Sequence, residues 1–502
     1  MTPVSDAVLD TLHESATRIF TDALAACDIA SAFDRRIRFE GGRMQRLMPD
    51  GSGPATIDLA CYRRVFVIAL GKAAGPMLGT LLVRMKRRKG LRGICCTNQQ
   101  PKSRNWRFRY FEGGHPLPNE DTFAAARATL ALLRKAKKDT LIFFLISGGG
   151  SAMFDLPIDA QISLDDTIEF HRLLLASGAP ISEVNTLRKH FSAVKGGRLA
   201  MAAPEALKVS LLLPDVPLRT LDALSSGPTS PDHSTVEDAR DLITKYGLAE
   251  KFPAPVRKFF ERTDLPESPG NKGWRPPFMP KVPRRITSAA TMSGEDEAFR
   301  DSVFEILLSS HDLVENARLQ AQKAGYFTVV DNSCDDWDYA DAAKYLLERF
   351  HELRRAHERV CLISVGEVTV TMDRTPGAGG RNQQFVLACA RDLEKYPSEH
   401  LTMLSAGSDG IDGNTLSAGA IADPTTVARA RSFGFDPEES LAEFNACPLF
   451  TALGDSVVTG PTGQNLRDLR LLIAERGRGS TRPTSLATPA KLERGTRPTL
   501  AN

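Results

Sequence analysis

Glycine-rich turns that follow strand-like apolar runs are the parts of this sequence best suited to chemistry. Residues 65–70 form an apolar run that ends at Gly71 and Lys72. A second run, residues 141–146, ends in a turn of Ser147, Gly148, Gly149, Gly150 and Ser151. Because glycine lets the backbone approach a ligand closely, consecutive N–H groups in such a turn can bind a phosphate. The turn matches neither the P-loop nor the dinucleotide-binding pattern. By itself it is therefore equally consistent with an anion site and with a plain tight turn.

A polar stripe is predicted further along the chain. At helical spacing, Asn185, Arg188, Ser192 and Lys195 fall on one face of a helix. Two cations and two hydrogen-bonding side chains suit anionic ligand groups, and a solvated surface face is the alternative. The pair at 196–197 is Gly-Gly, which has poor helix propensity and favours a cap or close approach over a surface helix.

Charged side chains also stand at strand ends. Lys72 follows the first apolar run, and Asp215 follows another at residues 209–213. A lysine in this place is most often solvent-facing, whereas an aspartate there can act as a base or bind a metal. His115 is in a conspicuous loop and is assigned a structural role. None of the histidines has a metal-ligand spacing such as H-E-x-x-H.

The second half of the chain carries similar groups. Arg381 follows Gly379 and Gly380, so a guanidinium stands beside flexible backbone. Asp409 and Asp412 form a tight turn, which predicts either a Mg²⁺ site or a plain Asx turn. A further small-residue turn at residues 459–465 is a candidate anion loop.

The elements that position these groups are predicted to be buried parallel strands alternating with helices. Runs that are apolar on both faces are typical of such strands, and the alternation predicts an α/β sheet. Ligands gather at the carboxyl ends of strands in these sheets, which is where each polar turn falls. In the second half, residues 360–365, 367–372 and 401–406 are predicted strands, and residues 313–324 have helical periodicity.

The length of 502 residues predicts two domains. We expect an N-terminal domain over 1–263, a proline-rich linker over 264–285, a C-terminal domain over 286–475 and a disordered tail over 476–502. A net charge of +3 without a basic stripe predicts no nucleic-acid partner. The absence of a signal-peptide layout or a membrane-length apolar run predicts a cytoplasmic protein with no membrane partner.

The ordered series of motifs resembles the glycerate 2-kinase family with a C-terminal MOFRL domain. The matching segments are GKAA at 71–74, GGHP at 113–116, SGGGS at 147–151, NTLRKH at 185–190, KGGR at 195–198, SGPT at 226–229, GGRNQ at 379–383, SDGIDG at 408–413 and TGPTG at 459–463. The resemblance implies a Rossmann-like N-terminal domain, a smaller α/β domain and an active site in the cleft between them. It also implies ATP and Mg²⁺, and phosphorylation of D-glycerate to 2-phosphoglycerate.

Matched positions imply roles for individual residues. Lys72 and Arg381 would stabilise the transferring phosphoryl group, and Asp215 would orient or deprotonate the hydroxyl. Asp409 and Asp412 would bind the metal. The residues implied around ATP or the substrate are Ser147, Gly148, Gly149, Gly150, Ser151, Asn185, Arg188, Lys195, Ser226, Gly227, Thr229, Glu367, Gly379, Gly380, Asn382, Thr459, Gly460, Thr462 and Asn465.

The sequence also departs from the family pattern. After Asp215 the family has an acidic residue where this chain has Leu218 and Arg219, and Leu416 falls within another stretch that lacks the usual carboxylate. Two alternatives to a kinase therefore stay open. One is a hydroxypyruvate reductase, which the missing dinucleotide pattern disfavours. The other is a non-catalytic paralogue that keeps the cleft and binds a nucleotide or another small molecule.

Overall fold

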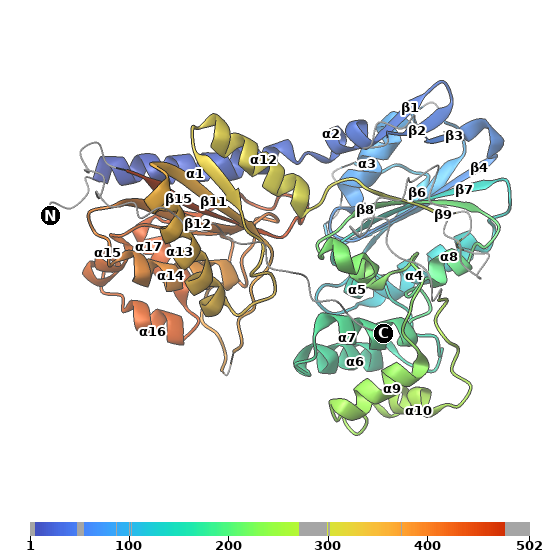
Figure 1. Ribbon diagram of the computed structural model, residues 1–502. Coiled ribbons are helices and arrows are strands. Elements are labelled where there is room, and N and C mark those ends of the chain that lie inside the picture. Colours follow the sequence, from blue (N-terminus) through green and yellow to red (C-terminus); the bar gives the residue numbers. More distant parts are fainter. Residues whose placement is uncertain are drawn as a thin grey trace, which may run out of the picture.

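The computed structural model describes residues 6–47, 55–86, 88–99, 101, 103–270, 299, 302–372 and 374–476. They form two halves that lie side by side, each built around a six-stranded sheet (Figure 1). A three-stranded antiparallel sheet, β1 (Ile37–Glu40), β2 (Arg43–Arg46) and β3 (Ala55–Asp58), borders the first half, followed by the short helix η1 (Leu59–Cys61). None of the helices in these ranges is long and apolar enough to cross a membrane.

The first large sheet is parallel throughout, with the order β6-β5-β4-β7-β8-β9. Its strands are β4 (Arg64–Leu70), β5 (Leu91–Thr97), β6 (Phe108–Glu112), β7 (Thr140–Ser147), β8 (Leu207–Leu213) and β9 (Ser302–Ile306). The chain runs outward from β4 in one direction and then from β7 in the other. This is the doubly wound Rossmann order, in which ligands bind where the direction switches. Here the switch lies between β4 and β7, and the predicted Rossmann-like fold is confirmed.

Helices cover both faces of this sheet, which explains why its strands are apolar on both sides. Val65 and Val67 of β4 belong to a core shared with α3 (Ala74–Arg84). Phe66 and Ile68, which alternate with them, belong to a second core shared with α4 (Glu120–Leu133). The short helices α5 (Gly150–Met153), α8 (Arg198–Met201) and η2 (Leu218–Ser226) contribute to the same core as α4, and Figure 1 shows α5 and α8 on the α4 side of the sheet.

A helical layer, which the sequence patterns did not predict as a unit, lies beneath the first sheet in Figure 1. It comprises α6 (Leu164–Ala176), α7 (Ile181–Phe191), α9 (Val236–Lys245) and α10 (Ala254–Glu261). Its core is aromatic: the rings of Phe170 and Phe191 stack with centroids 4.2 Å apart, and Phe252 and Phe260 pack against Phe170. α7 in turn contacts η2, the helix that follows β8 of the first sheet.

The second large sheet is mixed, with the order β10-β11-β15-β12-β13-β14. Its strands are β10 (Phe327–Val330), β11 (Arg359–Val365), β12 (His400–Gly407), β13 (Gly419–Ala422), β14 (Ser456–Val457) and β15 (Asp468–Glu475). β15 runs antiparallel between β11 and β12. The predicted strand over 367–372 is wrong, because Gly366 turns the chain at a φ of 137° and only Thr369 forms an isolated bridge, to Asp338.

Two layers of helices enclose this second sheet. α13 (Tyr339–Ala356), α14 (Arg381–Leu393), α15 (Thr426–Ser432), α16 (Pro437–Ala442) and α17 (Ala446–Leu453) contribute to the core of one face. The other face is covered by α1 (Asp6–Ala26) and α12 (Ser310–Lys323). A mixed α/β second domain confirms the predicted fold class.

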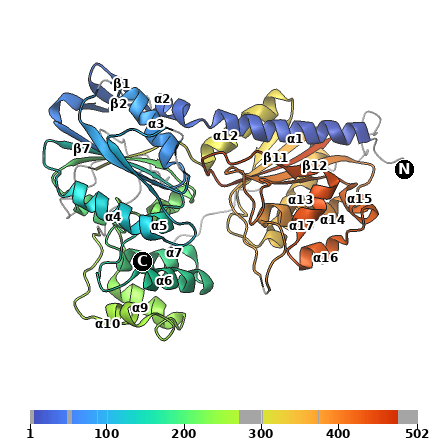
Figure 2. The same cartoon turned by 180° about the vertical axis from the view of Figure 1, so that it is seen from behind.

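The chain crosses between the halves in two places that lie side by side. α1 packs on α12 and β12 of the second half, and α2 (Ile29–Arg36) then enters the first half (Figures 1 and 2). The return crossing joins β9 to α12, and Asn316 Nδ2 of α12 donates to Cys27 Sγ at 3.4 Å. The predicted boundaries therefore differ from the structure at both crossings: α1 lies with the second half, and β9 pairs with β8 of the first. Residues 271–285 of the predicted linker and 477–502 of the predicted tail lie outside the described residues.

Candidate active site

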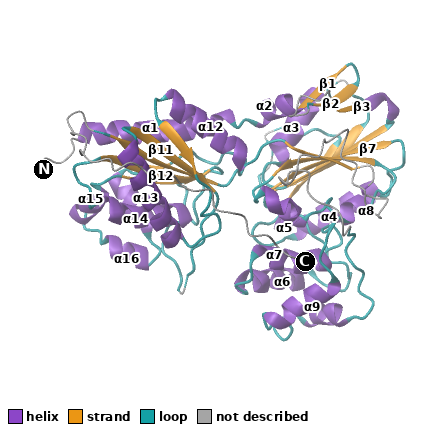
Figure 3. Cartoon of the chain, viewed as in Figure 1, coloured by secondary structure: helices purple, strands orange, loops and turns teal. Residues whose placement is uncertain are grey.

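A cleft with a volume of about 970 Å³ is lined by residues of both halves. Figure 3 shows the loops of each half in teal. The predicted residues that line it are Lys72, Asp215, Glu367, Gly379, Gly380, Arg381, Asp409, Asp412 and Asn465. Sequence reasoning missed six further polar residues in the lining, which are Asn98, Gln99, Asp336, Gln384, Asn414 and Arg467, and it gave His115 only a structural role. Gln464, also in the lining, belongs to the predicted anion loop at residues 459–465. The cleft opens at the switch point of the first sheet, where the fold favours a ligand.

The turns after β4 and β7 interlock at that switch point. Lys72 N donates to Gly148 O at 2.9 Å, and Ala73 N donates to Ser147 Oγ at 3.0 Å. Gly148 must be glycine, because a Cβ there would stand 1.8 Å from Asp215 Oδ2. The Ser147–Gly148 backbone thus holds Lys72 and Asp215 next to each other at the end of the sheet.

Lys72 reaches across the cleft. Its Nζ lies 3.4 Å from Asp409 Oδ2, and the side chains of Lys72 and Asp409 are 26% and 20% exposed. The contact joins the first half to the loop after β12. An ion pair that is partly open to solvent can exchange its carboxylate for a ligand phosphate at little cost.

Asp215 lines the cleft and is partly buried. Burial raises the pKa of its carboxyl above the ordinary range, although the positive charges of Lys72 and Arg467 oppose the shift. A carboxylate with a raised pKa is a stronger base than a solvated one. Asp215 is therefore equipped to accept a proton from a bound hydroxyl group.

Arg381, the first residue of α14, anchors a network of charges in the second half. Its Nε donates to Asp468 Oδ2 at 2.5 Å, and its Nη2 lies 2.8 Å from Glu367 Oε1. Burial raises the pKa of Glu367 to about 7, while Arg381 outweighs burial at Asp468 and holds that pKa below its usual range. Both carboxylates orient the guanidinium, and the 36% exposed side chain of Arg381 leaves it accessible from the cleft.

Arg467 adds a second guanidinium to the same wall. Its Nη1 and Nη2 donate to the two oxygens of Asp335 at 2.7 and 2.6 Å. Arg467 itself has a φ of 72° at the start of β15. No motif surrounded Arg467 in the sequence, so its position in the cleft depends on the placement of β15 between β11 and β12.

Asp412 caps helix α14. Its Oδ1 accepts from Asn382 N at 3.0 Å and from Asn382 Nδ2 at 3.2 Å, and its Oδ2 accepts from Gln383 N at 2.8 Å. Both oxygens are thus committed to the helix, and burial raises the pKa of this carboxyl to about 6. Asp409, the other predicted metal ligand, directs Oδ2 toward the ammonium group of Lys72 in the cleft. In the parts of the chain that the structure describes, no three His, Cys, Asp or Glu residues form a metal cluster.

The remaining predicted loop residues mostly bond to one another. Ser226 Oγ lies 2.9 Å from Ser151 Oγ and donates to Asn185 Oδ1 at 2.9 Å. Thr229 Oγ1 lies 3.0 Å from Ser210 Oγ beneath the Gly227 turn, inside the first half. In the second half, Thr462 Oγ1 donates to Ser408 O at 2.7 Å, while Thr459 Oγ1 bonds to Gly460 O. None of these residues is part of the cleft lining itself.

The predicted polar stripe is wrong beyond Arg188. α7 ends at Phe191, and Ser192 is extended with a ψ of 137°, so Ser192 and Lys195 do not continue the helix face. Lys195 points into the protein instead, where its Nζ lies 2.8 Å from Asp155 Oδ1 and donates to Phe154 O at 3.0 Å. Lys195 is 1% exposed and belongs to a buried ion pair.

Lys195→Met is expected to destabilise the fold by about 3–5 kcal/mol, because it leaves the fully buried Asp155 without its cation. Urea unfolding followed by circular dichroism measures this. Lys245→Met is the matched control: Lys245 pairs with Glu183 on the surface, so its loss should leave the unfolding midpoint nearly unchanged. Equal midpoints for both variants would contradict the assignment of Lys195 to a structural ion pair.

The same cluster predicts a pH dependence of stability. His171 Nε2 lies 2.8 Å from Asp155 Oδ2, and burial lowers the pKa of His171 from 6.5 to about 4. Between these two values the unfolded chain binds a proton that the folded chain does not, so stability falls as the pH drops through this window. The free energy of unfolding is expected to fall by on the order of 3 kcal/mol across this window. Urea midpoints measured from pH 7 to pH 4 should flatten in His171→Asn, and an unchanged slope would refute this origin.

The fold and cleft define a class: two-domain α/β proteins with a doubly wound first domain and charged loops from both domains around one cleft. Comparisons with known proteins agree. Residues 15–261 match a domain of unknown function, DUF4147, and residues 360–468 match the MOFRL family. The glycerate 2-kinase of Pyrococcus horikoshii is 33% identical over 427 residues, which cover 83% of this chain and 89% of that protein.

Two further comparisons bear on function. The crystal structure of glycerate kinase from Thermotoga maritima superposes with a TM-score of 0.72 at 28% identity, covering 93% of this chain and all of that one. A protein of Agrobacterium vitis that is provisionally named hydroxypyruvate reductase is 33% identical over 82% of this chain and 87% of its own length. This chain belongs to the glycerate 2-kinase family. The resemblance seen in the sequence is confirmed, and so is the predicted enzyme class, a phosphotransferase with an alcohol acceptor.

Proposed function

We propose that this protein transfers the γ-phosphoryl group of ATP to the 2-hydroxyl of D-glycerate, giving 2-phosphoglycerate. One observation carries the proposal: Lys72 and Asp215 of the first half face Arg381 and Asp409 of the second across a single cleft. Phosphoryl transfer needs cations around the transferring group and a base beside the acceptor hydroxyl. Family membership supplies the substrate pair, since glycerate kinases are named for it.

In the proposed reaction Asp215 accepts the proton as the O–H bond of glycerate breaks. The freed oxygen forms a bond to the γ-phosphorus, and the bond from that phosphorus to the bridging oxygen breaks, so ADP leaves with the electron pair. Lys72 and Arg381 lie on opposite walls and stabilise the negative charge of the transferring group. Asp409, the partner of Lys72 before ATP binds, is released when the phosphates take its place.

We propose that Mg²⁺ accompanies ATP and is held largely by the phosphates. This fits the donors present: Asp412 is committed to capping α14, which leaves Asp409 as the carboxylate near Lys72. Mg²⁺ commonly binds through one or two carboxylates together with substrate phosphates and water. The ion would supply additional neutralisation of phosphate charge.

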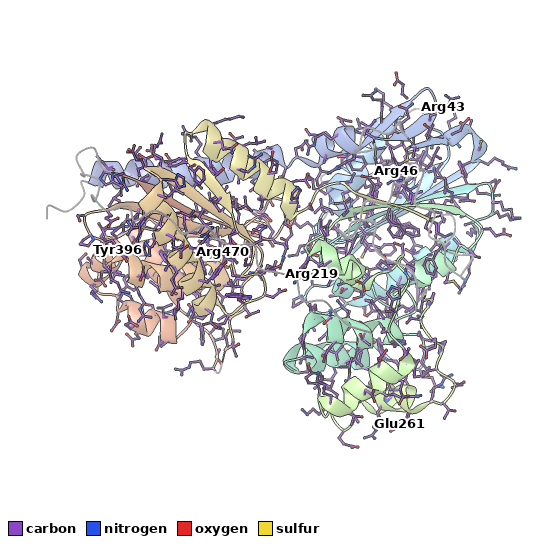
Figure 4. The ribbon with its side chains drawn as sticks, viewed as in Figure 1. Arg43, Arg46, Arg219, Glu261, Tyr396 and Arg470 are labelled. Atoms are coloured by element: carbon purple, nitrogen blue, oxygen red, sulfur yellow. The ribbon has the colours of Figure 1, made fainter. Side chains whose placement is uncertain are left out.

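Phosphorus NMR of the reaction mixture tests the proposal. The protein is incubated with ATP, Mg²⁺ and D-glycerate, and the expected product signal is 2-phosphoglycerate, with none when Mg²⁺ is replaced by EDTA. A 3-phosphoglycerate signal would correct the regiochemistry. Intact ATP would contradict the proposal and would favour the non-catalytic paralogue, which the departures at Leu218, Arg219 and Leu416 support. Arg219 stands at the boundary between the halves, 3.4 Å from Asp336 (Figure 4).

A hydroxypyruvate reductase is the second candidate, and the Agrobacterium vitis relative is the observation in its favour. Against it, the turn after β4 reads Gly71-Lys72-Ala73-Ala74 rather than G-x-G-x-x-G. Placing Lys72 in that turn puts a cation at the switch point, where a phosphoryl group can bind. Oxidation of NADH with hydroxypyruvate, followed at 340 nm, would support the reductase, and no oxidation is expected.

A further inference from the structure

A buried cation without a partner lies behind the first wall of the cleft. Arg188 of α7 is 5% exposed, and its Nε has no hydrogen-bond partner in the described part of the chain. No described carboxylate lies within ion-pair distance of its guanidinium. Buried charges in proteins are normally paired, because removing an ion from water is costly. An unpaired buried guanidinium therefore calls for a ligand.

The geometry of α7 directs Arg188 toward the cleft. Ile181, Asn185 and Arg188 are spaced four and three residues apart, so they share one helix face. Ile181 lines the cleft, and Asn185 contacts Ser226 on the loop that meets Ser151. The charge of Arg188 also contributes, after burial and Lys72, to lowering the pKa of His115, which is another lining residue. Arg188 itself is not among the lining residues, but its charge reaches the lining of the first half of the cleft at His115.

The surrounding charges leave Arg188 uncompensated. Asp155, whose negative charge acts on Arg188, is already paired with Lys195 at 2.8 Å and hydrogen-bonded to His171 at 2.8 Å. Because the pKa of His171 is lowered to about 4, this histidine is neutral at pH 7. One negative and two positive charges are therefore buried together. The cluster carries a single net positive charge, which matches one monoanion.

We propose that Arg188 binds the carboxylate of the acceptor hydroxy acid, while Lys72 and Arg381 face the phosphates of ATP. A guanidinium binds a carboxylate through two parallel hydrogen bonds, which fixes the orientation of the acid as well as its affinity. The bulky polyphosphate needs the open part of the cleft that Lys72 and Arg381 line, whereas a single small carboxylate fits beside a side chain that is only 5% exposed.

The inference rests on the proposed function and is tested by substrate discrimination. Wild-type protein should prefer glycerate to its uncharged amide, glyceramide, by about 100-fold in kcat/KM, the size expected for a buried charge pair. In Arg188→Met this preference should collapse to within about threefold, while the KM for ATP changes little. A KM for ATP that rises instead, or a preference that survives in Arg188→Met, would overturn the proposal.

A stability measurement separates this role from a structural one. Removing an unpaired buried cation should leave the melting temperature unchanged or raise it, whereas Lys195→Met, the matched buried cation with a partner, should lower it. A large loss of stability in Arg188→Met would indicate a structural guanidinium and contradict the inference.

Binding distinguishes failure of this inference from failure of the proposed function. Calorimetric titration of the wild-type protein with glycerate and with glyceramide, both without ATP, needs no turnover. Selective binding of glycerate that is lost in Arg188→Met supports the carboxylate site even if the phosphorus NMR experiment shows no kinase activity. Equal binding of acid and amide by an active kinase would overturn the site alone.

Discussion

Asp215→Asn is expected to lower kcat by about 10²–10⁴-fold, because the amide cannot accept the proton of the acceptor hydroxyl. Substrate contacts made by the side chain are retained, so the KM values for ATP and glycerate should change by less than about threefold. Initial rates in a coupled assay for ADP release measure this. Asp139→Asn is the matched control, since Asp139 pairs with Arg64 at the start of β4, the opposite end of the sheet from the cleft. Wild-type turnover in Asp215→Asn would exclude Asp215 as the base.

The pH profile gives an independent view of the same residue. Burial raises the pKa of Asp215, so the ionised form that accepts a proton is lost at a higher pH than for a solvated aspartate. The acid limb of the kcat/KM profile should therefore lie above pH 3.8, the ordinary value for aspartate, and should disappear in Asp215→Asn. The raised pKa also means that the charged carboxylate costs folding free energy near pH 7. Asp215→Asn should consequently be as stable as the wild-type protein or more so.

Lys72→Met is expected to lower kcat by about 10²–10³-fold with little change in stability. The loss in rate follows from removing a cation beside the transferring phosphoryl group. The small stability effect follows from the 26% exposure of the Lys72 side chain, since partly solvated ion pairs contribute little to folding. Steady-state rates and thermal melts of the same preparation measure both quantities.

Lys395→Met is the control for Lys72, because Lys395 also pairs with an aspartate but lies on the surface of the second half. A Lys72→Met variant whose KM for ATP rises while kcat stays normal would limit Lys72 to ground-state binding. A variant with normal kcat and normal KM would remove it from the site.

The sequence by itself determined the main strands of the first sheet and the charged residues that follow them. The runs at 65–70, 141–146 and 209–213 became β4, β7 and β8, because apolar residues on both faces can be buried only between layers of helices. Lys72 and Asp215 follow two of these strands, and the parallel order brings their carboxyl ends to one edge. The family could also be identified from the sequence, because the ordered series of motifs is far more specific than any single motif.

Only the tertiary structure decided which of these groups meet. Lys72 contacts Asp409 across 337 residues of chain, and Arg467 enters the cleft through the insertion of β15 between β11 and β12. Neither contact has a local signal, because non-local strand pairing leaves no periodicity in the sequence. The same holds for Lys195 and Arg188, which are alike in the sequence. Asp155 neutralises Lys195 and leaves Arg188 unpaired, and that difference arises from where the end of α7 places each side chain.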